Sequence, residues 1–300
     1  MDRPFEILTQ FIIPTMCCLT LAACQNSPSV KEGDTTGPPA AEPAHVIEGV
    51  RVNGGSDYGP YILFNASSFR ETENSKKLEK LVFYEAPEAP PANDDEPQIE
   101  DAVAGLYPLG WSKGDNFAYA VYSVAFHGAH VVNYELKDMG TGDILWRKEI
   151  SYAMVKDTAE LYSEMAADTV ILINGAESDA ELFKYAWMVS EKEVLPALER
   201  EGIIFNPSGA FLKQDYYKDN TFKVEKTAGE DPGDETEYTL KSNKLGPQVI
   251  YKDYFGREPE VAGVIKSPYN ETIAVICRQK RTLFEMANEV VPIIVGYKLD

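Results

Sequence analysis

The chain has 300 residues, enough for one or two domains with a sizeable core, and 44% of them are hydrophobic. This ordinary globular composition excludes a chain that is disordered throughout. The 28 Lys and Arg residues are outnumbered by 48 Asp and Glu residues, giving a formal net charge of −20. Nucleic acid would be repelled at long range and is excluded as a partner. We interpret the charge as a soluble, self-repelling surface rather than a specific cation site.

The amino-terminal residues have the pattern of an export signal. Residues 11–23 are mostly apolar, but this stretch is too short to span a bilayer as a permanent helix. It ends in Leu21-Ala22-Ala23-Cys24, which resembles a bacterial lipobox. The resemblance implies that a signal peptide, residues 1–23, is removed and that Cys24 carries the lipid, because durable anchoring requires several acyl chains.

The same resemblance predicts where the protein is located. Gln25 follows the lipidated cysteine and is not a residue for retention at the inner membrane, which favours sorting to the outer membrane. The protein is thus expected to be exported and anchored to the bacterial cell envelope through the lipid on Cys24. An uncleaved membrane-associated signal or a plain secretory signal is the alternative.

The remaining chain divides into a tether and a folded part. Residues 24–45 contain almost nothing to bury and predict a flexible tether. Residues 46–300 are expected to form a single β-rich globular domain, with a possible subdivision near 152–178. Three early strands are predicted between turn-forming and polar segments: 46–52, 58–65 and 78–84. Residues 86–101 are rich in proline and acids, which indicates an exposed loop. A calcium site in this loop is less favoured, because the ligand spacing of a calcium-binding loop is missing.

Turn chemistry and strand alternation agree over residues 106–151, which predict an antiparallel meander. Gly, Asp and Asn at 114–116 and again Gly and Asp at 140–143 suit tight hairpin turns. Phe117, Tyr119 and Val121 share one face of the strand between these turns. A meander of this kind must bury a face on neighbouring elements to be stable.

Two phrases of this meander resemble β-propeller repeats. Residues 111–119 (WSKGDNFAY) are similar to the W-S-P-D-G-x-x-I-A-Y phrase of TolB-type blades, with Lys113 in the usual place of proline. Residues 138–146 (DMGTGDILW) resemble the D-x-x-T-G-x-x-L-W hairpin of several propeller families. Weaker echoes follow at 205–212 and 266–275, but their spacing does not match blades of about 40 to 45 residues. The resemblance implies a partial or irregular propeller-like arrangement, and leaves open a closed propeller, a sandwich or an open sheet.

One helix is predicted after a short strand at 170–173. Ser178 is a candidate N-cap with an acid, Glu181, three residues later. Apolar residues then recur at three- and four-residue steps up to Gly202, so residues 178–201 predict an amphipathic helix, with a break near Pro196 as the alternative. We expect it to cover a sheet, in preference to binding a partner, because exposed apolar stripes are rare.

The last third of the chain returns to strands. Their predicted ranges are 221–227, 237–241, 248–254, 261–265, 272–277 and 292–299. Residues 230–235 predict a hairpin tip. Segments 261–265 and 293–295 are apolar on both faces and are the candidates for central strands. The predicted fold class is mainly β, with antiparallel meanders and one helix.

No established catalytic constellation is found in the sequence. It contains no nucleophile elbow, zinc-protease motif, phosphate-binding loop or dinucleotide fingerprint. His127 and His130 are weak metal candidates, because a site needs a third ligand that the local sequence does not supply. Cys277 continues an apolar strand, which indicates a buried inert thiol rather than a nucleophile. No cofactor and no catalytic residue is predicted.

Aromatic residues are the one surplus that suggests binding. The chain has 17 tyrosines, with clusters at 216–217 and 251–255 that would suit a face for sugars or peptides, although ordinary strand packing explains them as well. We therefore expect a non-enzymatic envelope module that binds or scaffolds a protein or glycan. The alternative is an envelope hydrolase acting on glycan or peptide with a carboxylate-based site.

Overall fold

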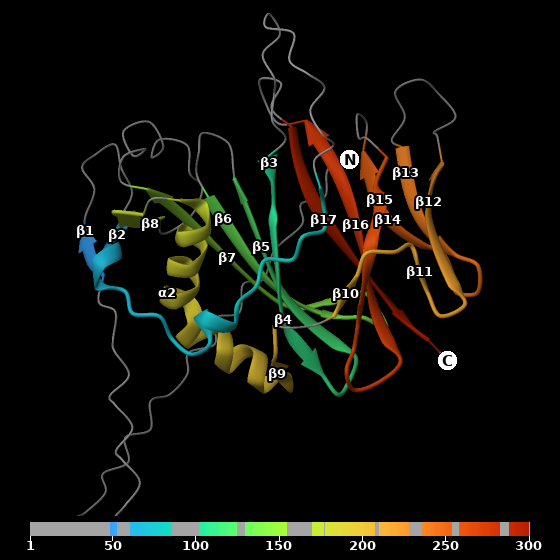
Figure 1. Cartoon of the computed structure of the whole chain (residues 1–300), viewed down its shortest axis with the longest axis horizontal. Helices are drawn as coiled ribbons and strands as arrows, with labels where there is room; N and C mark the ends of the chain where they lie inside the picture. Colours follow the sequence, from blue (N-terminus) through green and yellow to red (C-terminus); the bar gives the residue numbers. More distant parts are fainter. Residues whose placement is uncertain are drawn as a thin grey trace, which may run out of the picture. The chain divides into compact units, whose positions relative to one another are not determined.

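The structure is a computed structural model that describes residues 49–52, 61–85, 102–124, 130–154, 170–176, 178–207, 210–227, 236–253, 258–282 and 288–299. All of these residues belong to one compact unit, His45–Asp300. They form three β-sheets and one α-helix (Figure 1), which confirms a mainly β fold with a helix near 178–201. No helix among these residues is both long and apolar enough to cross a membrane.

The largest sheet, sheet A, has eight strands in the order β1-β2-β8-β7-β6-β5-β4-β9. The bounds are β1 Val50–Val52, β2 Tyr61–Asn65, β4 Gly105–Ser112, β5 Asn116–Val124, β6 His130–Asp138, β7 Ile144–Met154, β8 Val170–Asn174 and β9 Ile203–Phe205. Strands β4 to β7 are joined in sequence as antiparallel neighbours, so the predicted meander is present. Strand β8 is parallel to both of its neighbours, β7 and β2.

Two smaller sheets contain the other strands. Sheet B has the order β10-β15-β16-β17-β3, and sheet C has the order β11-β12-β13-β14. The strands of sheet B are β3 Ala102–Val103, β10 Phe211–Leu212, β15 Glu260–Lys266, β16 Thr272–Thr282 and β17 Asn288–Lys298. Those of sheet C are β11 Tyr216–Tyr217, β12 Asn220–Thr227, β13 Thr236–Ser242 and β14 Gln248–Asp253. Strand β16 is the central strand of sheet B, and β15 and β17 flank it. Of the two segments predicted to be central, 261–265 pairs on its second side only at Val264 and Ile265, and 293–295 pairs with β16 alone among the described strands.

The expected propeller-like arrangement is not observed over the described residues. A propeller repeats four-stranded blades around an axis, whereas here the sheets have eight, five and four strands in different orders. The meander continues into β8 through parallel pairing and into β9 at the other edge. Residues 266–275, which echo a blade phrase, contain the turn between β15 and β16. Three of the blade-like phrases, 111–119, 138–146 and 266–275, therefore mark hairpins, and the fourth, 205–212, leads from β9 of sheet A to β10 of sheet B.

Helix α2, Asp179–Arg200, begins as the sequence predicts. The Ser178 hydroxyl oxygen accepts a hydrogen bond from the backbone N–H of Glu181 at 3.3 Å, which satisfies one of the unpaired donors of the first turn. The helix runs through Pro196 without a break, so the broken alternative is wrong. It ends before Gly202, whose φ of +72° is the left-handed conformation that favours glycine.

Alternation along β5 explains how α2 packs against sheet A. The face with Ala118, Ala120 and Tyr122 contributes to the core beneath α2, and its two alanines leave room for large helix side chains. The buried helix side chains of this core are Leu182, Phe183, Ala186, Trp187, Met188, Val194 and Leu198. The helix therefore covers a sheet face, as predicted.

The opposite face of sheet A packs on sheet B. Phe117, Tyr119 and Val121, the face predicted from sequence, lie in a core with Ile265, Ala274, Ile276 and Ile294 of sheet B. The other face of sheet B packs on sheet C through residues that include Val275, Cys277 and Val295 of sheet B with Phe222 and Leu240 of sheet C. The order of layers is thus α2, sheet A, sheet B and sheet C (Figure 1).

The predicted strand 78–84 is the main error of element assignment. Its residues follow a short 3-10 helix, Ser75–Lys77, and make one isolated bridge, Leu81 to Leu106 of β4. Another 3-10 helix, Ala66–Ser68, follows β2. Leu81 and Phe83 are buried in the core between sheets A and B, so the alternating apolar pattern is satisfied without a ladder of strand hydrogen bonds.

Several other predictions fall outside the described residues. These are the signal peptide 1–23, the tether 24–45 with Cys24, the loop 86–101, the hairpin tip 230–235, and residues 155–169 of the possible subdivision near 152–178. Their boundaries remain predictions.

One carboxylate joins the turn between β4 and β5 to sheet B. Asp115, with φ of +73°, accepts hydrogen bonds from the Thr272 hydroxyl and from the side-chain amide of Asn270, and it forms an ion pair of 2.9 Å with Lys298. The Thr272 hydrogen bond, followed by the hydrogen bond and charge of Lys298, lowers the pKa of Asp115 from its ordinary value of 3.8. These contacts stabilise the charged carboxylate only in the folded protein.

Asp115→Asn is therefore expected to have a pH-dependent effect on stability. The folded-state pKa is depressed, so the stabilisation is complete above the unfolded pKa near 3.8 and is lost as the pH falls through the folded pKa. We expect the substitution to lower the free energy of unfolding by about 1–3 kcal/mol at neutral pH, and by much less at about pH 2. Urea unfolding of the wild type and the variant at the two pH values measures the loss of the free energy of unfolding at each. An equal loss of the free energy of unfolding at both pH values would show that the charge of Asp115 does not stabilise the folded protein.

Candidate ligand-binding groove

Of the histidine and cysteine candidates, the structure describes His130 and Cys277. His127 and Cys24 lie outside the described residues. His130 is buried, its Nδ1 is 2.5 Å from the Tyr122 hydroxyl, and the two rings stack at 5.4 Å. Among the described residues no group of three His, Cys, Asp or Glu side chains could hold a metal ion. The contact with Tyr122 places His130 in the core.

Cys277 is fully buried within sheet B. Burial raises the pKa of its thiol to about 12, so the thiol is protonated at neutral pH and is a poor nucleophile. This agrees with the buried, inert cysteine predicted from its apolar strand.

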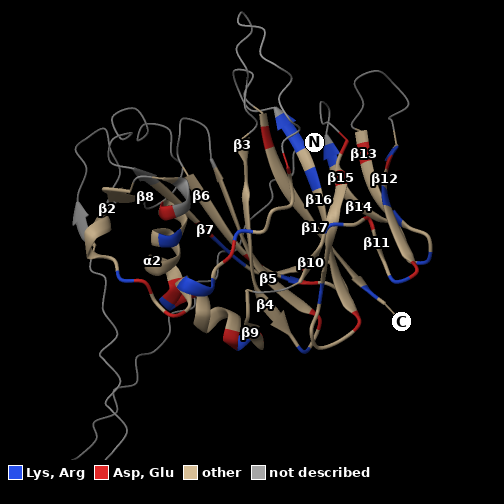
Figure 2. Ribbon diagram, in the orientation of Figure 1, with Lys and Arg blue, Asp and Glu red and all other residues tan. Residues whose placement is uncertain are grey.

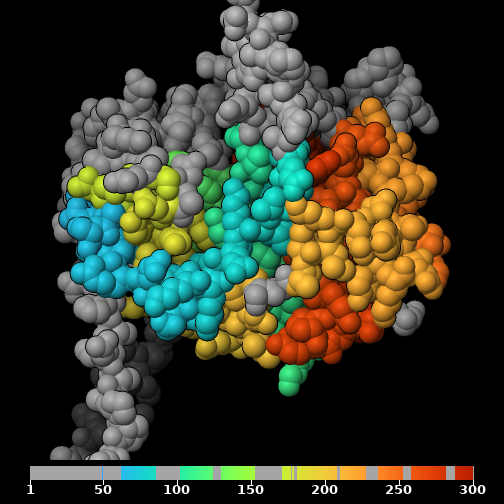
Figure 3. All heavy atoms as spheres, in the orientation of Figure 1, coloured from blue at the N-terminus to red at the C-terminus, as the bar shows by residue number. Residues whose placement is uncertain are grey.

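Two adjacent hollows form a groove between segment 81–85 and sheet B. Their volumes are about 370 and 400 Å³, and both are lined by Tyr84, Glu85 and Arg278. We call them together the groove. The first hollow is also lined by Val82, Phe83, Lys213, Gln214, Asp215, Val261 and Ala262, and the second by Glu258, Glu260, Lys280 and Val290. Figure 3 shows the cyan segment that ends at residue 85 beside the orange part of the surface.

Local backbone features create the walls of the groove. Strand β10 pairs with β15 over only two residues, and the backbone N–H of Gln214 then bonds the carbonyl of Leu212 at 2.9 Å, so the chain turns away. Strand β15 has a bulge near Ala262, where its register with β16 shifts. On the other side, the backbone N–H of Leu81 bonds the Leu106 carbonyl of β4 at 2.7 Å. Sheet B therefore leaves a gap that segment 81–85 faces but does not fill.

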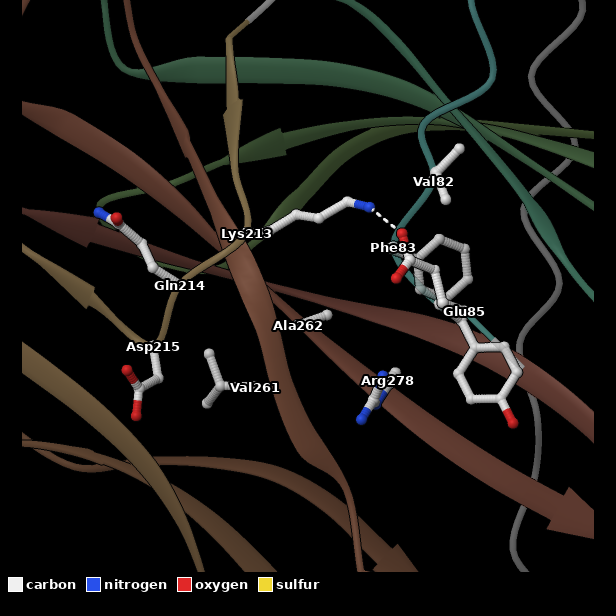
Figure 4. A pocket seen from close by; sticks show the side chains of 10 residues that line it. Val82, Phe83, Glu85, Lys213, Gln214, Asp215, Val261, Ala262 and Arg278 are labelled. Atoms are coloured by element: carbon white, nitrogen blue, oxygen red, sulfur yellow. Dashed lines mark hydrogen bonds and ion pairs between the residues drawn. The ribbon is translucent and has the colours of Figure 1, made fainter. Parts of the chain in front are cut away.

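An ion pair spans the first hollow. The ammonium of Lys213 donates to the Glu85 carboxylate from the opposite wall (Figure 4). The hydrogen bond and the charge of Lys213 lower the pKa of Glu85. Both side chains are largely exposed, so a ligand can reach this pair from solvent.

Arg278 lies where the two hollows meet. Its Nε and Nη2 atoms donate to the same oxygen of Glu260 at 3.0 and 2.6 Å. Its guanidinium lies 5.3 Å from the centre of the Tyr84 ring, a distance typical of a cation–π contact. Strand β16 thus supplies a cation that is held by an acid of β15 and an aromatic ring of segment 81–85.

Charges of both signs line the groove. Lys213, Arg278 and Lys280 are basic, while Glu85, Asp215, Glu258 and Glu260 are acidic. Figure 2 shows the basic residues near the end of β16 and acidic residues on nearby strands. The carboxylates of Asp215 and Glu258 make no hydrogen bond or ion pair with any described side chain. The groove therefore offers both hydrogen-bond donors and free acceptors.

A buried carboxylate lies outside the groove. Glu289 is 1% exposed and accepts from Arg281 at 2.8 and 3.1 Å; burial, the largest effect, raises its pKa. It alternates along β17 with Val290, which lines the groove, so it lies on the other face of sheet B. This perturbed acid is enclosed by the fold and does not supply a proton donor to the groove.

The described tyrosines of the clusters predicted from sequence do not line the groove. Tyr216 is exposed, Tyr217 packs partly against the core between sheets B and C, and Tyr251 stacks on Tyr238 at 6.2 Å. Residues 254–255 lie outside the described part of the chain. The aromatic side chains that the structure places in the groove are Phe83 and Tyr84, and neither belongs to the clusters selected from sequence.

A third hollow, of about 430 Å³, lies between β7 and α2 and is lined by Trp146, Lys148, Glu193 and four neighbouring residues. Lys148 and Glu193 form an ion pair across it. The groove is the better candidate, because it consists of two adjoining hollows that share Tyr84, Glu85 and Arg278.

Comparison with known proteins gives no relative from which a function could be transferred. No family model, no curated protein and no solved structure matches the chain.

Proposed function

We propose that the chain is a lipid-anchored protein of the bacterial cell envelope that works as a non-enzymatic binding module, with the groove as its contact surface. The lipobox-like residues ending at Cys24 support the anchor. The tether 24–45 would let the folded part stand away from the membrane. The partner is an envelope protein or glycan, and Gln25 favours the outer membrane as the site of anchoring.

The observation that carries this proposal is the meeting of the two hollows at Arg278 and Tyr84. Ligand sites are concave and carry a few convergent polar groups on a largely preformed frame. Here the groove lies between a segment pinned to the β4–β7 meander and the interior strands of sheet B. Its cations are held in place by ion pairs, which reduces the ordering cost of binding.

The alternative is an envelope hydrolase with a carboxylate-based site. Such an enzyme requires a carboxylic acid whose pKa is raised, so that it can protonate the leaving group. Glu85 has a lowered pKa because it pairs with Lys213, which is the opposite of the shift that a proton donor needs. The perturbed acid Glu289 is buried on the other face of sheet B. These two observations favour binding over hydrolysis.

The test is co-sedimentation of the full-length protein, in detergent, with insoluble envelope fragments of its host. Arg278→Glu removes the cation shared by both hollows and places a negative charge beside Glu260. We expect it to weaken envelope binding by about tenfold or more, because it reverses a charge at the centre of the contact surface.

The matched control is Lys252→Glu, which reverses a cation that pairs with Glu237 on sheet C at 3.1 Å. It should leave binding unchanged. Circular dichroism of both variants checks that they fold, and Lys213→Glu provides a second groove variant if Arg278→Glu is unstable. Equal binding by the wild type, the groove variants and the control would show that the groove is not the contact surface.

A further inference from the structure

The charge balance of the groove restricts the kind of ligand that it can hold. Three basic side chains stand against four acidic ones, although the whole chain carries a net charge of −20. Each of Lys213 and Arg278 already pairs with an acid. A strongly anionic or cationic ligand would have to break these pairs and would meet like charges on the walls. A neutral ligand meets neither penalty.

The free hydrogen-bonding groups point to a ligand with hydroxyl groups. Both nitrogens of Arg278 that bond Glu260 use one carboxylate oxygen, so the other oxygen of Glu260 and the Nη1 of Arg278 have no partner among the described residues. Asp215 and Glu258 add further free acceptors. A hydroxyl group donates one hydrogen bond and accepts others, so it can join a carboxylate and a cation at once. A chain of hydroxyl-bearing rings can therefore bond both the acids and the cations that line the groove.

Apolar surface in the groove gives such rings a face to pack on. Tyr84 lies at the junction of the hollows, with Arg278 over its ring at 5.3 Å. Val82 is 52% exposed, and Val261 and Ala262 line the same hollow (Figure 4). The C–H face of a sugar ring is apolar while its edge carries hydroxyl groups, so it can contact an aromatic or aliphatic side chain and hydrogen-bond to the walls together.

We infer that the ligand of the groove is a neutral oligosaccharide, with Tyr84 and Val82 contacting sugar faces and Arg278, Glu260, Asp215 and Glu258 bonding hydroxyl groups. This inference rests on the proposed function, since it names the ligand class of the same groove. A peptide is the competing occupant. A peptide that bound as an added strand would need regularly spaced backbone donors and acceptors along the edge of β15. The bulge near Ala262 interrupts that spacing, so a peptide suits the groove less well.

The experiment measures whether soluble compounds displace the full-length protein from envelope fragments by competing for the groove. The probes are two neutral trimers, of N-acetylglucosamine and of glucose, the cationic glucosamine trimer, and a peptide of alternating Lys and Ala. We expect a neutral trimer to displace the full-length protein with little dependence on salt, because no ionic ligand contact is formed. Tyr84→Leu should weaken that displacement about tenfold, while Tyr84→Phe, which keeps the ring, should not. Tyr216→Leu, which removes an exposed tyrosine of β11 outside the groove, is the matched control and should have no effect.

The outcomes separate this inference from the function on which it rests. Displacement by the cationic trimer or the peptide, with strong salt dependence, would overturn the neutral ligand and leave the binding function standing. If neither neutral trimer displaced the protein, while Arg278→Glu still weakened envelope binding, the neutral oligosaccharide would be overturned as well. If envelope binding does not depend on the groove, the proposed function itself is wrong.

Discussion

Trp187→Ala is expected to lower the free energy of unfolding by about 3–5 kcal/mol, the range for removing a fully buried aromatic side chain. Trp187 is 0% exposed and lies between α2 and sheet A, with ring centres 5.4 Å from Phe205 and 6.0 Å from Tyr134. Its removal would leave a cavity where the helix covers the meander. Urea unfolding followed by circular dichroism measures the change.

Trp187→Phe is the matched control for this prediction. The indole Nε1 of Trp187 has no hydrogen-bond partner among the described residues, so phenylalanine loses volume but no bond. We expect a cost clearly below that of alanine, about 1–2 kcal/mol. If both variants were as stable as the wild type, α2 would not be held on sheet A as the structure has it.

Cys24→Ala is expected to move the protein from the membrane fraction to the soluble fraction. If Cys24 carries several acyl chains, each buried methylene contributes about 0.8 kcal/mol to anchoring, and the variant loses all of them. Fractionation of host cells and labelling with a radioactive fatty acid measure the change.

Cys18→Ala provides the control for the lipid anchor. Cys18 lies in the predicted signal peptide and would be removed with it, so this variant should stay anchored and labelled. Membrane partition and labelling that survive Cys24→Ala would show that another residue or segment holds the protein at the membrane.

Local signals in the sequence predicted the local elements well. The cap at Ser178 and the apolar spacing that follows fix α2, because both act within a few residues. Alternation in β5 correctly assigned Phe117 and Tyr119 to one face. These elements depend on backbone preferences and on a buried face, which the sequence displays directly.

Pairing between distant segments was harder to predict. The parallel contacts of β8 with β7 and β2 join strands that no turn connects, and they replace the expected blade by an eight-stranded sheet. Segment 78–84 has the alternation of a strand, yet burial of Leu81 and Phe83 between two sheets satisfies that pattern without a ladder.

The groove was not predictable from sequence for the same reason. Glu85, Lys213, Glu260 and Arg278 come from four separate segments, and each is an ordinary charged residue in its own surroundings. Only the packing of segment 81–85 against sheet B brings them together. Of the tyrosines that the sequence singles out, Tyr217 and Tyr251 pack on other side chains, and the described members do not line the groove.

The proposed function at the cell envelope requires that Cys24 carry a lipid anchor. The most direct measurement is the intact mass of the protein extracted with detergent from membranes of its own host. We expect the mass of a chain that begins at an acylated Cys24. An unmodified mass that includes residues 1–23 would contradict the anchor and, with it, the assignment of the groove to an envelope ligand.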